Sequence, residues 1–346
     1  MEYTGLIRKY PCNRPLTELE RAHQLKQNVR LPLHPHYQLS VIAMNSTYLE
    51  SVDKWFAWKG VITLVATSML VLFSWIFGGM AAQSLLEASN VRPSTDEVSI
   101  LWLDGLAALL VCSVLAWAAI WLLRKESFAY THYPMRFNRK NRMVHVFQTD
   151  GTTLSVPWDD IFFTLGKMAS EWEVRGHVLD GDRTTVRATF ALSCVRVLND
   201  YDTNPNTRKF SDQDFVRGHW EFIRRYMEDG PQTLTSQVEF CMPLDGRRET
   251  AMGGVHRILA NFAGGSLPLL LVAFPFCAIT SMFRIVAMRT SKIPQWPKDV
   301  EDACKIEPGD PFAIRGDDAG NRVPVFPEAA TAAGVRFIGQ APGSGT

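Results

Sequence analysis

The chain has 346 residues and a formal net charge of +1, with 36 Lys and Arg against 35 Asp and Glu. This length suits two domains, or one domain combined with membrane segments. The even balance of charge excludes the strong overall field that marks many nucleic-acid-binding proteins. The 6 cysteines lack CxxC spacing, so the sequence predicts neither a disulfide framework nor a zinc site.

Two long runs without a charged residue predict a helical hairpin that crosses a membrane. The runs are Gly60–Leu86 and Gly105–Leu123, and about 20 helical residues cross a ~30 Å hydrocarbon core. We place transmembrane helices at 57–82 and 100–123 and an external loop at 83–99. The alternative is a buried helix pair in a soluble protein. It fits less well, because both runs are long for core helices and tryptophans flank them as in interfacial belts.

The Lys and Arg residues predict the orientation, because the cytoplasmic flanks of membrane helices are enriched in these cations. Cations are frequent before the first uncharged run, and Arg124 and Lys125 directly follow the second. The loop between the helices is acidic and contains a single cation, Arg92. The sequence therefore predicts a multi-pass membrane protein whose N-terminal segment, 1–56, and block 124–257 are cytoplasmic.

A third uncharged run, 258–283, leaves its topology open. A spanning helix would place the C-terminal tail, 290–346, outside, whereas a re-entrant or interfacial segment would keep the tail in the cytoplasm. Cations flank the run on both sides, so the charge rule does not decide between the two. The length of the run favours the span, and the two glycines and two prolines inside it favour an interrupted segment.

The block 124–250 shows first the alternation of strands and then the period of a helix. Segments 128–137 and 143–148 are rich in aromatic and β-branched residues, and an Asp-Gly pair at 150–151 is a strong hairpin signal. In segment 214–231, apolar residues recur every three to four positions until a Gly-Pro stop. We expect a cytoplasmic α+β domain, either a pleckstrin-homology-like barrel with one C-terminal helix or a plain α+β sandwich.

Four cations crowd the turn that is expected between the first two of these strands: Arg136, Arg139, Lys140 and Arg142. A solvated hairpin tip explains them in the simplest way. The functional alternative is contact with anionic lipid headgroups or with a partner protein, since the turn soon follows the second membrane helix and each cation contributes ~1 kcal/mol near an anionic surface. Nucleic acid is not expected as a partner, because acids balance bases in this block.

The sequence contains no convincing catalytic constellation. Trp158 and Asp159 belong to a WDD stretch that resembles a metal pair, but a buried Trp and an Asp that caps the next helical turn explain the stretch more simply. The histidines of the N-terminal segment do not have the spacing of a zinc site. We therefore expect no enzymatic activity, no cofactor and no metal, and we interpret Trp158 and Asp159 as a structural motif.

Six stretches of the chain carry a resemblance to a known group of proteins. They are YPMRFNRKNRMVHVF (133–147), SVPWDDI (155–161), HVLD (177–180), ATFAL (188–192), HWEFIRRYMEDGP (219–231) and IPQWPKDVEDAC (293–304). Together they resemble an uncharacterised family of proteobacterial inner-membrane proteins, and YPxRFNRKxR and VPWDD are the most specific parts. The resemblance implies a location in the bacterial inner membrane, a cytoplasmic domain between membrane segments and a role beside type VI secretion effectors. It implies no catalytic residue.

Three functions are compatible with these features. The first is an immunity or accessory membrane protein that binds its cognate effector toxin or a component of the secretion system. The second is a membrane-anchored lipid or stress sensor that uses the basic turn. The third is an effector that damages membranes through segment 258–283. The resemblance and the lack of a catalytic constellation favour the first.

Overall fold

The computed structural model describes residues 5–7, 9–90, 95–168, 171–193, 212–238, 240–261 and 267–316. Its helices are α1 (Glu18–Ala22), α2 (Val61–Phe73), α3 (Gly79–Asn90), α4 (Thr95–Leu123), α5 (Asp212–Glu228), α6 (Ala251–Ala260), α7 (Leu267–Thr290) and α8 (Lys298–Ala303). Its strands are β1 (Arg14–Pro15), β2 (Gln24–Leu25), β3 (Val41–Met44), β4 (Tyr48–Ser51), β5 (Met135–Asn138), β6 (Met143–Phe147), β7 (Thr153–Pro157), β8 (Ile161–Met168), β9 (Glu171–Leu179), β10 (Thr185–Ala191) and β11 (Ile314–Arg315). Short 3-10 turns include η1 (Phe56–Trp58) and η3 (Trp158–Asp160), and a π-helical turn, η2 (Ser74–Gly78), joins α2 to α3.

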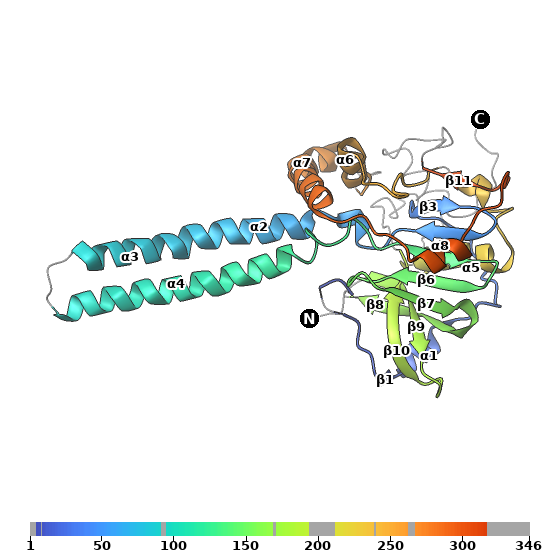
Figure 1. The fold of residues 1–346 in the computed structure, drawn as a ribbon, viewed down its shortest axis with the longest axis horizontal. Coiled ribbons are helices and arrows are strands. Elements are labelled where there is room, and N and C mark those ends of the chain that lie inside the picture. Colours follow the sequence, from blue (N-terminus) through green and yellow to red (C-terminus); the bar gives the residue numbers. More distant parts are fainter. Residues whose placement is uncertain are drawn as a thin grey trace.

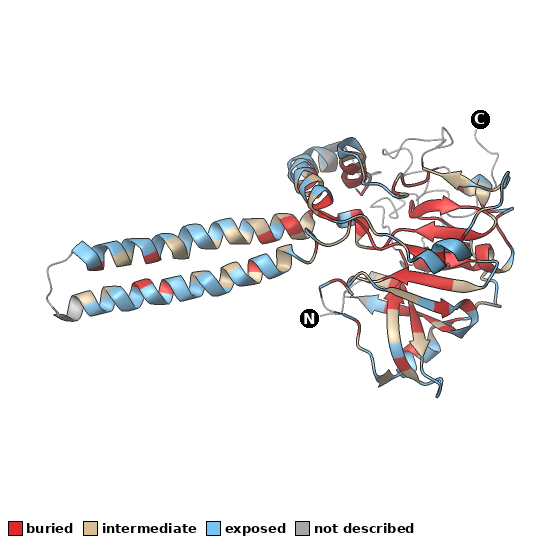
Figure 2. Ribbon diagram, in the orientation of Figure 1, coloured by how far each residue is buried: buried red, intermediate tan, exposed pale blue. Residues whose placement is uncertain are grey.

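A long helical arm projects from a mixed α+β head (Figure 1). The arm consists of α2, η2 and α3, packed along α4. Among the described residues, three helices are long and apolar enough to span a membrane: Val61–Asn90, Val98–Leu123 and Leu271–Thr290. In the most apolar stretch of each of the first two, only 11% of the residues are buried, and the arm is accordingly exposed along its length in Figure 2. An apolar surface of this size indicates a membrane protein, and the two apolar helices of the predicted hairpin are confirmed.

The helices of the arm continue beyond the predicted membrane boundaries. Segment 83–99, predicted as a loop, is helical up to Asn90 and again from Thr95. Strong helix formers fill α3, and the Gln83 amide donates to the Glu87 carboxylate one turn later (3.1 Å). The first apolar stretch has 30 residues, which is about 45 Å of helix. These helices are therefore longer than a hydrocarbon core is thick.

Two antiparallel sheets and α5 form the core of the head. One sheet has the order β11-β3-β4-β5-β6-β7, and the other has the order β1-β10-β9-β8-β2. Helix α5 contacts β9 of one sheet and β5 of the other. Its Trp220 stacks on Trp158 with ring centroids 5.4 Å apart, and both indoles are 0% exposed. The predicted α+β class is thus confirmed.

The head includes strands from before and after the arm. Tyr48 of β4 lies opposite Asn138 of β5, and Ser51 lies opposite Met135. The chain passes from Ser51 towards α2 and reaches Met135 from α4, so the Tyr48–Asn138 end of this pair is the end farther from the arm. β11 pairs with β3, so the chain after α7 also returns to this sheet. Of the predicted tail, 290–346, residues 317–346 lie outside the described part.

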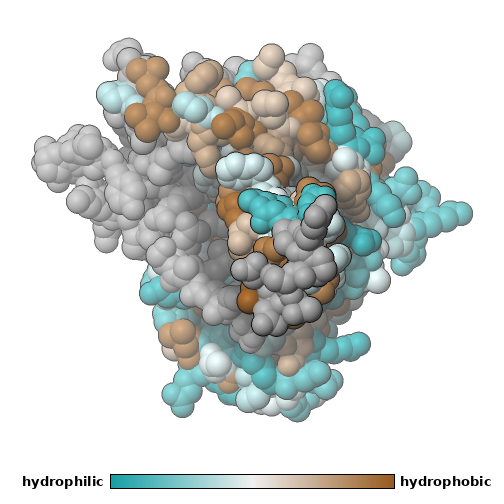
Figure 3. All heavy atoms as spheres, turned by 90° about the vertical axis from the view of Figure 1, so that its left-hand side faces the viewer, coloured by the Kyte–Doolittle hydropathy of each residue, from teal (hydrophilic) through white to brown (hydrophobic). Residues whose placement is uncertain are grey.

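Helices α6 and α7 lie beside the base of the arm. The run predicted as one apolar segment at 258–283 is divided between them, because α6 ends at Ala260 and α7 extends from Leu267 to Thr290, with Pro275 inside it. Helix α7 contacts both α6 and α2. Figure 3, a view along the arm, shows hydrophobic side chains gathered in the upper part of the molecule, where Figure 1 places these two helices.

Candidate functional site at the base of the arm

A set of charged side chains connects the head to the arm, and we call it the joint. Its members have side chains that are almost completely shielded from solvent: Asp53, Lys59, Glu126, Glu249 and Arg284. A buried charge is costly unless it is paired or hydrogen-bonded. The partners of each side chain therefore show which segments the joint holds together.

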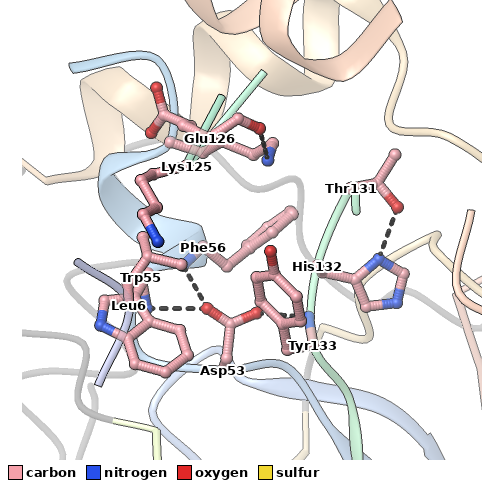
Figure 4. Close-up of a pocket in the computed structure, with 10 residues that line it drawn as sticks. Leu6, Asp53, Trp55, Phe56, Lys125, Glu126, Thr131, His132 and Tyr133 are labelled. Atoms are coloured by element: carbon pink, nitrogen blue, oxygen red, sulfur yellow. Dashed lines mark hydrogen bonds between the residues drawn. The ribbon is translucent and has the colours of Figure 1, made fainter. Parts of the chain in front are cut away.

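Asp53 ties the chain that enters α2 to the chain that leaves α4. Its Oδ1 accepts hydrogen bonds from the backbone N–H groups of Trp55 (2.8 Å) and Phe56 (3.0 Å), at the start of η1. Its Oδ2 accepts from the N–H of Tyr133 (2.7 Å), beyond α4 (Figure 4). Burial raises the pKa of Asp53, and the N–H of Tyr133 acts in the opposite direction. One carboxylate thus fixes the spacing of the two segments.

Lys59 and Glu126 connect the start of α2 to the chain that follows α4, at the base of the arm. Glu126 Oε2 accepts from the N–H (2.7 Å) and the hydroxyl (2.6 Å) of Thr63, in the first turn of α2, where helix N–H groups lack intrahelical partners. Lys59 Nζ donates to the backbone carbonyls of Glu126 (3.1 Å) and Tyr130 (2.8 Å). Burial lowers the pKa of Lys59 to about 8, against the opposing effect of Glu126. The start of α2 is therefore held by the chain that follows α4.

Arg284 brings α7 to the same place. Its guanidinium forms a two-point ion pair with Glu249, with Nε–Oε2 2.6 Å and Nη2–Oε1 3.0 Å. Its Nη1 donates to the carbonyls of Phe56 (2.7 Å) and Lys59 (3.2 Å), just before α2. Gly60 permits this approach, because a Cβ there would lie 2.6 Å from the backbone nitrogen of Arg284. The joint therefore includes three elements: α2, the chain after α4, and α7.

The cavity inside the joint is too small for a substrate. Its lining includes Asp53, Lys59 and Glu126, together with aromatic side chains such as Trp55 and Tyr133 (Figure 4). Its free volume is about 10 Å³, close to what one water molecule needs, whereas ligand pockets measure roughly 300–1,000 Å³. The arrangement is therefore suited to a mechanical role, in which it fixes the orientation of the head on the arm.

His132 should make the joint sensitive to acid. This side chain is 3% exposed, and burial, with Lys59 as a second cause, lowers its pKa to about 3 from 6.5. Between these two pKa values, His132 therefore binds a proton in the unfolded chain but not in the folded protein. The contribution of neutral His132 to the free energy of unfolding is complete above about pH 6.5. It is lost as the pH falls towards the folded pKa, and the loss is about 3 kcal/mol when the pH reaches about 4. Thermal unfolding measured across this pH range tests the expectation.

The control for this measurement is His132→Gln, which keeps an amide near the hydroxyl of Thr131 but does not titrate. In the native protein Thr131 Oγ1 lies 3.0 Å from His132 Nδ1. The variant should lose less stability than the parent protein over the same pH range, whatever its stability at neutral pH. Identical pH slopes for the two proteins would show that His132 is not responsible.

Arg136 does not lie in the predicted basic turn. It is part of β5 and is 7% exposed, and its Nε donates to Glu50 Oε2 of β4 (2.8 Å). Its guanidinium lies between the rings of Tyr48 and Trp296, 4.8 and 5.0 Å from their centroids. The prediction of a solvated or lipid-facing Arg136 is wrong, because β4 places a carboxylate directly opposite it in the sheet.

Of the other cations of the turn, Lys140 and Arg142 also have carboxylate partners in the protein. The exposed Lys140 forms an ion pair with Glu307. Arg139 is half-buried and donates its backbone N–H to the carbonyl of Thr47 (2.9 Å). Arg142 pairs with two carboxylates, described below. The turn follows Asn138, at the end of the sheet farther from the arm.

Trp158 and Asp159 form one cluster with Arg142 and Glu228. Trp158 is 0% exposed, and its Nε1 donates to Glu228 Oε1 of α5 (2.7 Å). The sequence predicts that an Asp caps the helical turn, but η3 has no side-chain cap. Asp159 instead accepts two hydrogen bonds from Arg142 (2.5 and 2.7 Å). Arg142 also pairs with Glu228 (2.9 Å), and its hydrogen bond lowers the pKa of Asp159. The cluster ties the basic turn to η3 and α5.

A second buried cluster lies in the other sheet and was not predicted from the sequence. His177 of β9 has its Nδ1 2.7 Å from the hydroxyl of Thr189 and its Nε2 3.3 Å from Glu20. Glu20 also pairs with Arg14 (2.5 Å). The only local signal is the capping box of Thr17 and Glu20. His177 is fully buried, so the cluster links the N-terminal segment to the sheet.

No group of three or more His, Cys, Asp or Glu side chains is placed to hold a metal ion within the described part of the chain. The fold and the joint together define a class: a membrane-anchored protein whose α+β head is fixed to a helical arm by buried charges. The chain belongs to DUF6708, a family of unknown function, whose family model matches residues 112–308. This region includes the C-terminal part of α4, the basic turn, Trp158 and α7. No curated protein and no solved structure matches the chain.

Proposed function

We propose that the protein is a non-enzymatic binding protein of the bacterial inner membrane that serves a type VI secretion effector as an immunity or accessory protein. The observation that carries the proposal is the joint, in which Asp53, Glu126 and Arg284 fix the head to the arm. A protein that captures a partner at a membrane needs a surface held in a fixed orientation. The link to effectors rests on the resemblance of the YPMRFNRKNR and VPWDD stretches, and the cytoplasmic side rests on the cations at both ends of the arm.

The described part of the head contains a groove of a size that suits a segment of a protein partner. Its volume is about 460 Å³, and residues 30–35 and Arg225 line it. Two of these residues, Pro32 and Pro35, restrict the backbone, so less conformational entropy is lost on binding. Arg30 is exposed, while Arg225 is held by Glu221 (2.7 Å). An acidic segment of the effector would complement these guanidinium groups.

A binding measurement with the detergent-solubilised full chain tests the partner. The protein should retain the effector encoded beside its gene, and Arg30→Glu should weaken the binding about tenfold or more, because a favourable contact becomes repulsive. The matched control is Lys140→Glu, a charge reversal at another exposed cation, which should leave the affinity unchanged. Equal affinities of all three proteins for the effector would exclude the groove as its binding site. If none of the three binds the effector, the result would count against the proposed function.

A competition experiment tests immunity directly. A strain without the gene should be killed by sister cells that carry the neighbouring effector, because the toxin then acts unopposed. The full chain supplied in trans should restore survival to the parental level. Unchanged survival of the deletion strain would exclude immunity and leave only an accessory role.

The lipid sensor is the second candidate, and the order of elements in the head favours it. Strands β5 to β10 are followed by α5, as expected for a pleckstrin-homology-like domain. The basic turn gives it less support, because Arg136 and Arg142 are engaged with carboxylates. A sensor of this kind requires that Arg139→Ala and Lys140→Ala together weaken the preference of the full chain for anionic over neutral bilayers. Under the main proposal this preference stays unchanged.

A membrane-damaging effector is the third candidate. It would require the 258–283 segment to perforate the bilayer in which the protein resides. Overproduction of the full chain should then depolarise the cells. Undisturbed membrane potential during overproduction would exclude this function.

A further inference from the structure

The chain on both sides of α6 and α7 belongs to the same folded head. Before α6, the N–H of Met242 donates to the carbonyl of Val41 in β3 (2.7 Å). After α7, Trp296 Nε1 donates to Glu50 of β4 (2.9 Å), and β11 pairs with β3. A bilayer cannot pass through a packed sheet. Both ends of the α6–α7 segment therefore lie on the same side of the membrane.

This shared side excludes α7 as a single transmembrane helix, although its length and composition would allow a span. One crossing would carry residues 291–316 to the opposite side from β3 and β4, with which they pack. Helix α6 cannot supply a return crossing, because its 10 residues make about 15 Å of helix against a ~30 Å hydrocarbon core.

Helix α7 lies across the base of the arm. It meets the arm where the backbone of Arg284 approaches Gly60, at the start of α2. In Figure 1, α7 is seen nearly along its axis, whereas α2 and α4 lie across the page. In Figure 3, which looks along the arm, the hydrophobic side chains of this region spread sideways. The axis of α7 thus follows the plane of a bilayer that the arm crosses.

The exposed face of α7 is apolar. It includes Leu271 (67% exposed), Val272 (79%), Phe274 (62%) and Met282 (67%). Contiguous apolar surface of this kind marks a contact with lipid or with another protein. The face adjoins the apolar surface of the arm through the contact between α7 and α2. This continuity favours lipid, which already surrounds the arm in a membrane.

Cations gather at the C-terminal end of α7. Arg289, in its last turn, and Lys292, just beyond it, are both exposed. Arg248 lies beside Arg289 in a shared recess and donates to the carbonyl of Ser291 (3.0 Å). The nearby Glu249 is already in an ion pair. This end therefore presents positive charge where the phosphates of a bilayer would lie.

We propose that α7 is a monotopic membrane helix, which lies flat in the leaflet on the side of the head. Leu271, Phe274 and Met282 then lie among the acyl chains, and Arg289 and Lys292 lie at the phosphates. The head is held at the bilayer by α7 as well as by the two helices of the arm, so it cannot rotate about the arm. The inference rests on the location of the arm in the membrane and does not depend on the identity of the partner.

Depth measurements with spin labels test this proposal. The full chain, with its native cysteines replaced, is labelled at one position at a time in nanodiscs of phosphatidylcholine with and without phosphatidylglycerol. Labels at Leu271, Phe274, Met282 and Val286, which share one helix face, should all lie at one shallow depth. Collision rates with oxygen and with a water-soluble nickel complex report this depth. A spanning or steeply inserted α7 would instead change the depth by about 22 Å from Leu271 to Val286.

Two labels in the arm separate the possible failures. Val71 and Leu110, which are 65% and 67% exposed, should lie deep in the hydrocarbon. Deep arm labels with level, shallow α7 labels support the proposal. A graded depth along α7, free access of nickel to its labels, or protection from both reagents as between two copies of the chain overturns it. Arm labels outside the hydrocarbon would overturn the membrane location itself, and the proposal with it.

Discussion

Replacing Arg136 by Ala should lower the free energy of unfolding of the head by about 3–5 kcal/mol, the usual loss when one partner of a buried ion pair is removed. Glu50 is 4% exposed, so its carboxylate would keep only the hydrogen bond from Trp296 (2.9 Å). Burial already raises the pKa of Glu50 while Arg136 acts to lower it. The truncation also removes the packing of the guanidinium between Tyr48 and Trp296.

Thermal or denaturant unfolding of the full chain in detergent, followed by near-ultraviolet circular dichroism, measures this loss. The matched control is Lys140→Ala, which removes an exposed cation from the adjacent turn. The side chains of Lys140 and Glu307, which form an ion pair, are 42% and 68% exposed. The control should therefore change the free energy of unfolding by no more than about 1 kcal/mol. A double replacement, Arg136→Met with Glu50→Met, should recover part of the loss, because no unpaired charge stays buried. Equal effects of Arg136→Ala and Lys140→Ala would contradict the expectation.

Replacing Gly60 by Val should break the contact between α7 and the arm. Gly60 has φ 106°, a backbone conformation that residues with a Cβ rarely adopt. A Cβ added at this position would lie 2.6 Å from the backbone nitrogen of Arg284. Backbone strain and overpacking together should cost about 3 kcal/mol or more. Because Arg284 also caps the carbonyls of Phe56 and Lys59, its displacement should loosen the joint as a whole.

Limited proteolysis of the full chain in nanodiscs measures this loosening, since cleavage near residues 124–134 and 250–261 should accelerate. The matched control is Gly79→Ala, at the start of α3, where a Cβ would meet nothing within 4 Å. A helical glycine replaced by Ala gains about 0.5–1 kcal/mol, so this variant should resist the protease at least as well as the parent. Unchanged cleavage of Gly60→Val would show that the contact does not hold the joint together.

The sequence predicted those features of the fold that depend on neighbouring residues. Uncharged runs predicted the arm, and apolar residues every three to four positions predicted α5. The length of the helices in the arm was underestimated, because strong helix formers such as Gln83, Glu87 and Ala88 continue α3 without an uncharged run. The candidate site was predicted less well. An Asp of the WDD stretch was expected to cap its own helical turn, but the Asp159 carboxylate is bound by Arg142 of the basic turn.

The sequence by itself determined that two uncharged helices belong in a membrane and that an α+β head accompanies them, because burial of apolar surface depends on composition and period. The tertiary structure decided the environment of Arg136 and showed that both ends of the α6–α7 segment pack in the same head. Both depend on segments distant in sequence: β4 brings Glu50 to Arg136, and β11 holds the chain after α7 on the side of the head. Pairing between remote strands leaves no periodic trace in either segment, so the same four cations and the same apolar run fit opposite predictions until the sheet is known.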